Sequence, residues 1–69
     1  MISKIQIQKQ ENNFTVTAYV GEAILTTETR ESFLKAQELA TAMAFFNGSE
    51  SLINSVKKAN EELYNQLKN

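Results

Sequence analysis

Glutamate supplies every acidic side chain of this 69-residue chain, and Glu61-Glu62 is the one adjacent pair of acids. Two carboxylates can act as general acid and general base when they face one another across a reacting group. Adjacent residues of a helix point about 100° apart, so this pair cannot face one another in that way. Lys57 and Lys58 precede them by four residues each, a spacing typical of a solvated helix surface.

The sequence also lacks the residues that most other catalytic mechanisms need. Histidine, cysteine and aspartate are absent, which removes the commonest general base, the commonest zinc ligand and all thiolates. No serine has a histidine to activate it. The only glycines, Gly21 and Gly48, occupy expected turns and do not form a phosphate-binding loop. We therefore expect a protein that is not an enzyme and binds neither metal nor cofactor.

Length and charge restrict the function further. We expect one domain, 1–69, and a domain of this size buries only about 60% of its unfolded surface. Disulfides and cysteine-bound metal are excluded, so self-association is the remaining way to gain stability, and we predict a homodimer. The net charge is −1, which is neither the basic balance of a dedicated nucleic-acid binder nor the acidic balance of a DNA mimic.

The pattern of apolar residues indicates a cytoplasmic protein, in the host cell if the chain is phage-encoded. No apolar run approaches the length of a membrane span. The opening residues, "MISKIQIQKQ", alternate and lack the apolar core of a signal peptide.

Strict alternation of apolar and polar residues predicts three strands, at about 2–10, 14–20 and 23–28. Asn12-Asn13 suits a two-residue type I′ turn, and Gly21-Glu22 suits a type II′ turn. These turns set Ile7 opposite Ala18 and Ile5 opposite Val20 in an antiparallel meander of order 1-2-3. One face is then apolar, and on the third strand this inner face consists of Ala23, Leu25 and Thr27.

Two helices are predicted to follow, at about 30–47 and 50–67. Thr29 is the expected N-cap of the first and Gly48 its left-handed C′ residue, while Ser49 caps the second. One arc of the first helix should pack on the sheet: Phe33, Ala36, Leu39, Ala40, Met43, Ala44 and Phe46. The fold class is therefore α+β, a β-β-β-α-α chain in which an antiparallel helix pair covers one sheet face.

The opposite, outer face of the sheet is the first candidate interaction surface. Its uncharged members are Gln6, Gln8, Thr15, Thr17, Tyr19, Ile24 and Thr26. By the predicted register Tyr19 faces both Gln6 and Ile24. The alternative is an ordinary solvated face, because threonine has high β propensity.

The helices carry two further candidates. Leu34 and Phe45 lie opposite the core arc of the first helix, where they meet either the second helix of the same chain or another protein. On the second helix, the candidate dimer contact consists of Ile53, Val56, Asn60, Leu63 and Leu67. In heptad terms Asn60 takes an a position, where a buried asparagine can set dimer register; the alternative is a half-exposed residue at the edge of the stripe.

The passage "TTETRESFLKAQELA" and the strands before it, from Phe14 to Phe46, resemble in layout the amino-terminal module of tyrosine recombinases. The resemblance implies a sheet that reads DNA. That family carries many Lys and Arg residues on its sheet, whereas this outer face has only Lys4 at its margin, so the phosphate contacts that dominate affinity are missing.

The function that the sequence favours is a small non-catalytic protein-interaction or regulatory module. It would bind a larger protein, as a phage or mobile-element accessory protein or inhibitor does. This expectation comes from the small domain and a composition rich in Lys, Asn, Gln, Ile and Glu. A DNA-binding sheet is the alternative, and a structural or assembly accessory is a third possibility.

Overall fold

The computed structural model describes residues 1–68, with side chains for residues 1–66. Its elements follow the predicted order: β1 (Lys4–Lys9), β2 (Phe14–Val20), β3 (Ala23–Arg30), α1 (Phe33–Asn47) and α2 (Glu50–Lys68). The strands form one antiparallel sheet in the order β1-β2-β3. The predicted α+β fold is therefore confirmed.

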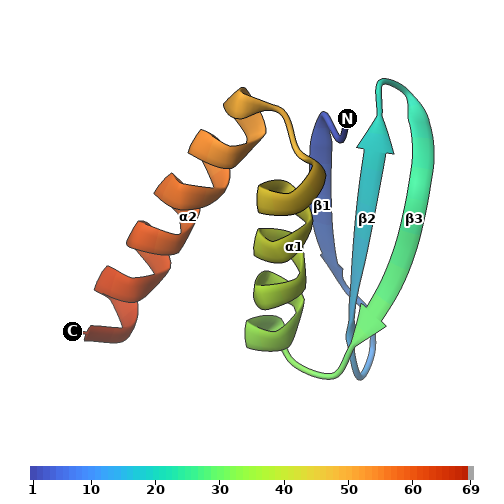
Figure 1. Ribbon diagram of the computed structural model, residues 1–69. Coiled ribbons are helices and arrows are strands. Elements are labelled where there is room, and N and C mark those ends of the chain that lie inside the picture. Colours follow the sequence, from blue (N-terminus) through green and yellow to red (C-terminus); the bar gives the residue numbers. More distant parts are fainter. Residues whose placement is uncertain (69) are drawn as a thin grey trace.

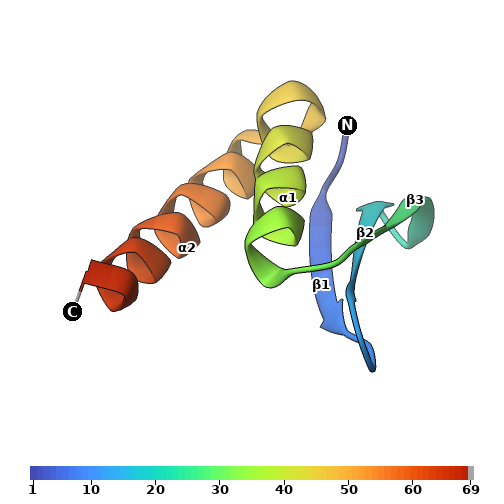
Figure 2. The ribbon, with the colours of Figure 1, turned by 90° about the horizontal axis from the view of Figure 1, so that it is seen from below.

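The helix α1 lies between the sheet and α2, as Figures 1 and 2 both show. Ala36, Ala40 and Ala44, one turn apart along α1, are buried. Ala36 and Ala40 form the core with Val16 of β2, and small side chains at these positions let the helix lie close to the strands. Larger, partly buried side chains complete this core: Ile5, Ile7, Phe14, Leu39 and Met43.

The second helix packs against α1. The helix α1 ends at Asn47 and α2 begins at Glu50, and the two helices diverge from this junction toward the C-terminal end of α2 (Figure 1). Ser49 caps α2 as predicted, because its Oγ accepts a hydrogen bond from the backbone N–H of Leu52 at 3.1 Å.

The β1–β2 turn differs from the prediction. The pairing sets Ile7 opposite Val16 and Ile5 opposite Ala18, so the connection is the longer loop 10–13, in which the N–H of Gln10 donates to the carbonyl of Asn13 at 2.7 Å. A type I′ turn would need positive φ at both asparagines, and no described non-glycine residue has it. The apolar faces still coincide, because the register moves by an even number of residues.

The β2–β3 turn is confirmed, but β3 then departs from the predicted register. Gly21 has φ +64°, and Val20 pairs with Ala23 as expected. A β-bulge follows, because Tyr19 pairs with Ile24 while Ala18 pairs with Thr26, which leaves Leu25 as the extra residue. One extra residue exchanges the faces of the strand beyond it.

Both ends of α1 also differ from the prediction. Thr29 pairs with Thr15 in the sheet, so it cannot cap the helix, and Ser32 accepts from the N–H of Lys35 instead. Gly48 is extended, with φ −94°, rather than left-handed. Glycine is needed there for close approach, because a Cβ would lie 2.5 Å from the carbonyl oxygen of Ala44.

The chain's first residues tie the sheet to the helix junction. Ile2 is 3% exposed and forms a parallel bridge with Gly48. Its N–H donates to the carbonyl of Asn47 at 2.7 Å, and its own carbonyl accepts from the N–H of Ser49 at 3.0 Å. The residues that precede β1 thereby hold the junction between α1 and α2.

Candidate interaction surfaces

Tyr19 lies on the middle strand of the outer sheet face, near the end of β2. Lys4 pairs directly with it, and the Lys4 Nζ lies 5.3 Å from the centroid of the tyrosine ring. The Tyr19 hydroxyl donates to Gln6 Oε1 at 3.3 Å. Gln6 itself stands opposite Thr17 rather than opposite Tyr19, so the predicted Gln6–Tyr19 pair is diagonal.

The pairing brings most of the predicted outer-face residues together. Gln8 pairs with Thr15, and Ile24 pairs with Tyr19 as expected. Thr26 is the exception, because the bulge at Leu25 places it on the helix-facing side, opposite Ala18. Thr27 and Thr29 take its place on the outer face, opposite Thr17 and Thr15. The predicted inner position of Thr27 is therefore wrong for the same reason.

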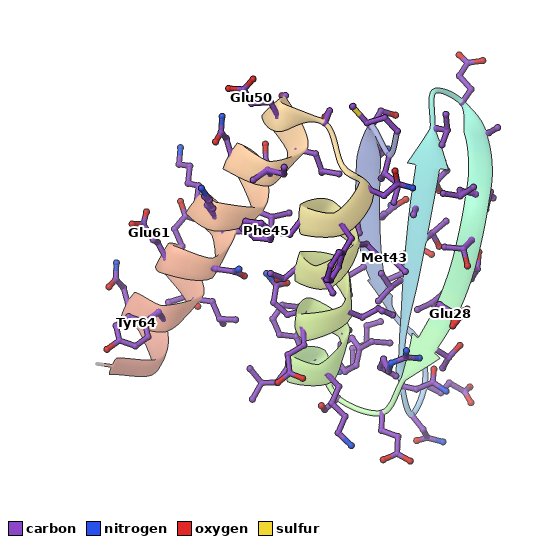
Figure 3. The ribbon with its side chains drawn as sticks, viewed as in Figure 1. Glu28, Met43, Phe45, Glu50, Glu61 and Tyr64 are labelled. Atoms are coloured by element: carbon purple, nitrogen blue, oxygen red, sulfur yellow. The ribbon has the colours of Figure 1, made fainter. Side chains whose placement is uncertain are left out.

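The two apolar residues predicted on the far side of α1 are both about half exposed, Leu34 at 53% and Phe45 at 49%. Figure 3 shows Phe45 directed to the space between the helices. Lys57 of α2 covers part of its ring, with Nζ 5.7 Å from the centroid. The chain's own α2 thus contacts Phe45 without burying it.

Both the oxygen and the nitrogen of the Asn60 side-chain amide form hydrogen bonds within the chain. Its Oδ1 accepts from Gln37 Nε2. Its Nδ2 donates to Thr41 Oγ1 at 3.2 Å, and the Thr41 hydroxyl donates in turn to the carbonyl of Gln37 at 2.7 Å. This polar network joins α2 to α1.

The other residues of the predicted dimer stripe differ in how far their side chains are buried. Val56 is buried and, with Ile5, Ile7 and Leu52, lines an apolar groove of about 220 Å³ between β1 and the helices. Ile53 and Leu63 are half-buried. The Leu67 side chain lies outside the described residues.

Three exposed apolar side chains that sequence reasoning missed lie toward the same end of the molecule. Val20, Leu25 and Phe46 are 41%, 53% and 90% exposed. Hydrogen bonds from Ser3 to the carbonyl of Tyr19 and from Ile2 to that of Asn47 bring the ends of β2 and α1 together. We call these three residues the apolar end.

Two members of the predicted core arc are therefore exposed. Phe46 follows Ala40, which is buried, by six residues and so points about 120° away from it, beyond the part of α1 that the sheet covers. Phe33 is 41% exposed, although its ring meets Phe14 edge-on with centroids 5.8 Å apart. The angular position of Phe46 at the rim of the arc was the signal that could have identified it.

The described residues show two further properties of the chain. Within residues 1–68, no group of three or more acidic, histidine or cysteine side chains is arranged to hold a metal ion. None of the helices in this part of the chain has the length and apolar character needed to cross a membrane.

Comparison with protein families, with curated proteins and with solved structures finds no match to this chain. The resemblance to the recombinase module therefore rests on the layout of the elements alone.

Proposed function

We propose that this chain is a small non-catalytic interaction module that regulates a larger protein by binding to it through the apolar end. The observation that carries the proposal is Phe46, 90% exposed at the end of α1 and accompanied by Val20 and Leu25. Large aromatic side chains are costly to leave in water, and exposed clusters of them mark interaction sites. The partner's complementary surface is then apolar where it meets these three side chains.

The setting we propose is a phage or mobile-element accessory protein that acts in the cytoplasm as a homodimer. Its support is the composition and the small domain, which contains no cysteine. A chain of this length gains stability when a second copy buries part of its surface.

Binding to DNA through the outer sheet face is the second candidate. Lys4 beside Tyr19 favours it, because a lysine and an aromatic ring together suit a nucleotide. Lys4 is, however, the only basic side chain among the outer-face positions, and phosphate contacts dominate DNA affinity. We therefore favour a protein partner.

The test is capture of a partner from a bacterial lysate by the immobilised chain, with and without nuclease. We expect a discrete protein that is retained after nuclease treatment and lost with the double variant Leu25→Ser/Phe46→Ser. Thr29→Ala, on the outer face, serves as the matched control and should bind like the wild type. Capture that disappears with nuclease would support the DNA alternative, and capture indifferent to Leu25 and Phe46 would contradict our proposal.

A further inference from the structure

One exposed side of α2 has a charge pattern that is complementary to itself. Asn54, Lys57, Glu61 and Tyr64 are all exposed, and their spacing of three, four and three residues places them in one row along the helix. We call this row the outer stripe. Figure 3 shows Glu61 and Tyr64 on the side of α2 that faces away from the sheet.

The order of these residues matters because it is symmetric about Ala59. When a second α2 lies antiparallel with a twofold axis near Ala59, Lys57 meets Glu61 of the second copy, and Asn54 meets Tyr64 of the second copy. The same two contacts recur on the other side of the axis, as an isologous interface requires. A parallel arrangement would instead set lysine against lysine and glutamate against glutamate, which is unfavourable.

Aromatic residues lie close to both ends of this row. Tyr64 is 65% exposed, and Phe45 of α1, beside Lys57, is 49% exposed. In the antiparallel arrangement Tyr64 of the second copy lies three residues from the Lys57–Glu61 contact, about 4.5 Å along the helix axis. Tyr64 of the second copy then packs beside Asn54 within the contact, and buried aromatic side chains supply much of the affinity of protein interfaces.

We propose that a second copy of this chain docks on the outer stripe, with the two α2 helices antiparallel and Lys57 of each paired with Glu61 of the other. This inference rests on the proposed self-association and identifies its surface. It moves the contact from the predicted stripe, of which Val56 and Asn60 are engaged inside the chain, to the adjacent side of α2.

Mixing of charge-reversed chains tests the pairing. Lys57→Glu and Glu61→Lys each set like charges together in their own homodimers, so we expect dimerisation about tenfold weaker or more by sedimentation equilibrium. An equimolar mixture should recover wild-type association. In the mixed dimer the glutamate introduced into one chain meets the lysine introduced into the other, while the unchanged Glu61 of the first chain meets the unchanged Lys57 of the second. The ordinary pairing of residues four apart within one helix cannot produce this recovery.

Glu62→Lys is the matched control. It makes the same charge change one residue further along, about 100° around the helix, and should dimerise like the wild type. Circular dichroism confirms that every variant is folded. A wild-type chain that sediments as a monomer would refute self-association itself. A wild-type dimer that the single reversals leave intact, or that mixing fails to restore, would refute the outer stripe as its contact while leaving self-association standing.

Discussion

Asn60, a polar residue on the apolar stripe of α2, forms hydrogen bonds within its own chain. Its amide bridges Gln37 and Thr41, so hydrogen bonds join α1 and α2 near the middle of both helices. A buried asparagine in a coiled coil can determine the register between chains, whereas here the same residue type forms hydrogen bonds between two helices of one chain.

The energy of this bridge can be measured by a double-mutant cycle. Asn60→Ala and Thr41→Val should each destabilise the fold, and their coupling energy should be about 1 kcal/mol, the usual net value of a protein hydrogen bond. Urea denaturation of the two single variants and the double variant gives the coupling. Strictly additive effects would show that the Asn60–Thr41 hydrogen bond contributes nothing to stability.

At the scale of the elements, Ile2 ties the chain before β1 to the junction of α1 and α2, because both its backbone N–H and its backbone carbonyl form hydrogen bonds there. We expect Ile2→Ala to lower the free energy of unfolding by about 2 kcal/mol or more, since it empties a site that is 3% exposed. Ile24→Ala is the matched control, because Ile24 is 62% exposed, and it should change stability by less than about 1 kcal/mol. Equal midpoints in urea for the two variants would contradict a structural role for Ile2.

The bulge in β3 can be tested by comparing two single-residue deletions in this strand. Deletion of Leu25 removes the extra residue and preserves every other pair between β2 and β3, so the variant should stay folded. Deletion of Thr27 changes faces in either register. With the bulge kept, Glu28 and Arg30 exchange faces, and with the bulge lost, Thr26 moves to the outer face opposite Thr17. We therefore expect a lower urea midpoint for the Thr27 deletion than for the Leu25 deletion, and the reverse order would argue against the observed register.

On the scale of the whole molecule, charge separates the two candidate functions. The chain carries net charge −1, and its outer sheet face contributes one basic side chain, Lys4. We predict no binding to duplex DNA at physiological salt, because too few phosphates can be neutralised. The measurement is an electrophoretic mobility shift with sub-micromolar protein, repeated at low salt.

Lys4→Glu provides the control for that measurement. A complex that forms only at low salt and that Lys4→Glu abolishes would be non-specific attraction by this side chain. A complex that persists at physiological salt would overturn the prediction and favour the DNA-binding alternative.

The sequence by itself determined the features that depend on residues close together along the chain. Alternation along the chain predicted the three strands and which side of β1 and β2 is apolar, and the helical period predicted the buried alanines of α1. Gly21 and Ser49 identified a turn and a cap, because positive φ and the capping hydrogen bond are local requirements.

Only the tertiary structure decided how distant segments meet. The length of the 10–13 loop and the bulge at Leu25 depend on pairing between strands, and the bulge alone moved Thr26 to the inner face. Burial within α1 depends on how far the sheet and α2 extend around it, which left Phe46 exposed and Phe45 half-covered. Apart from the position of Phe46 at the rim of its arc, hydrophobicity and period are the same for covered and uncovered residues, so the packing of the elements decides which of them are exposed.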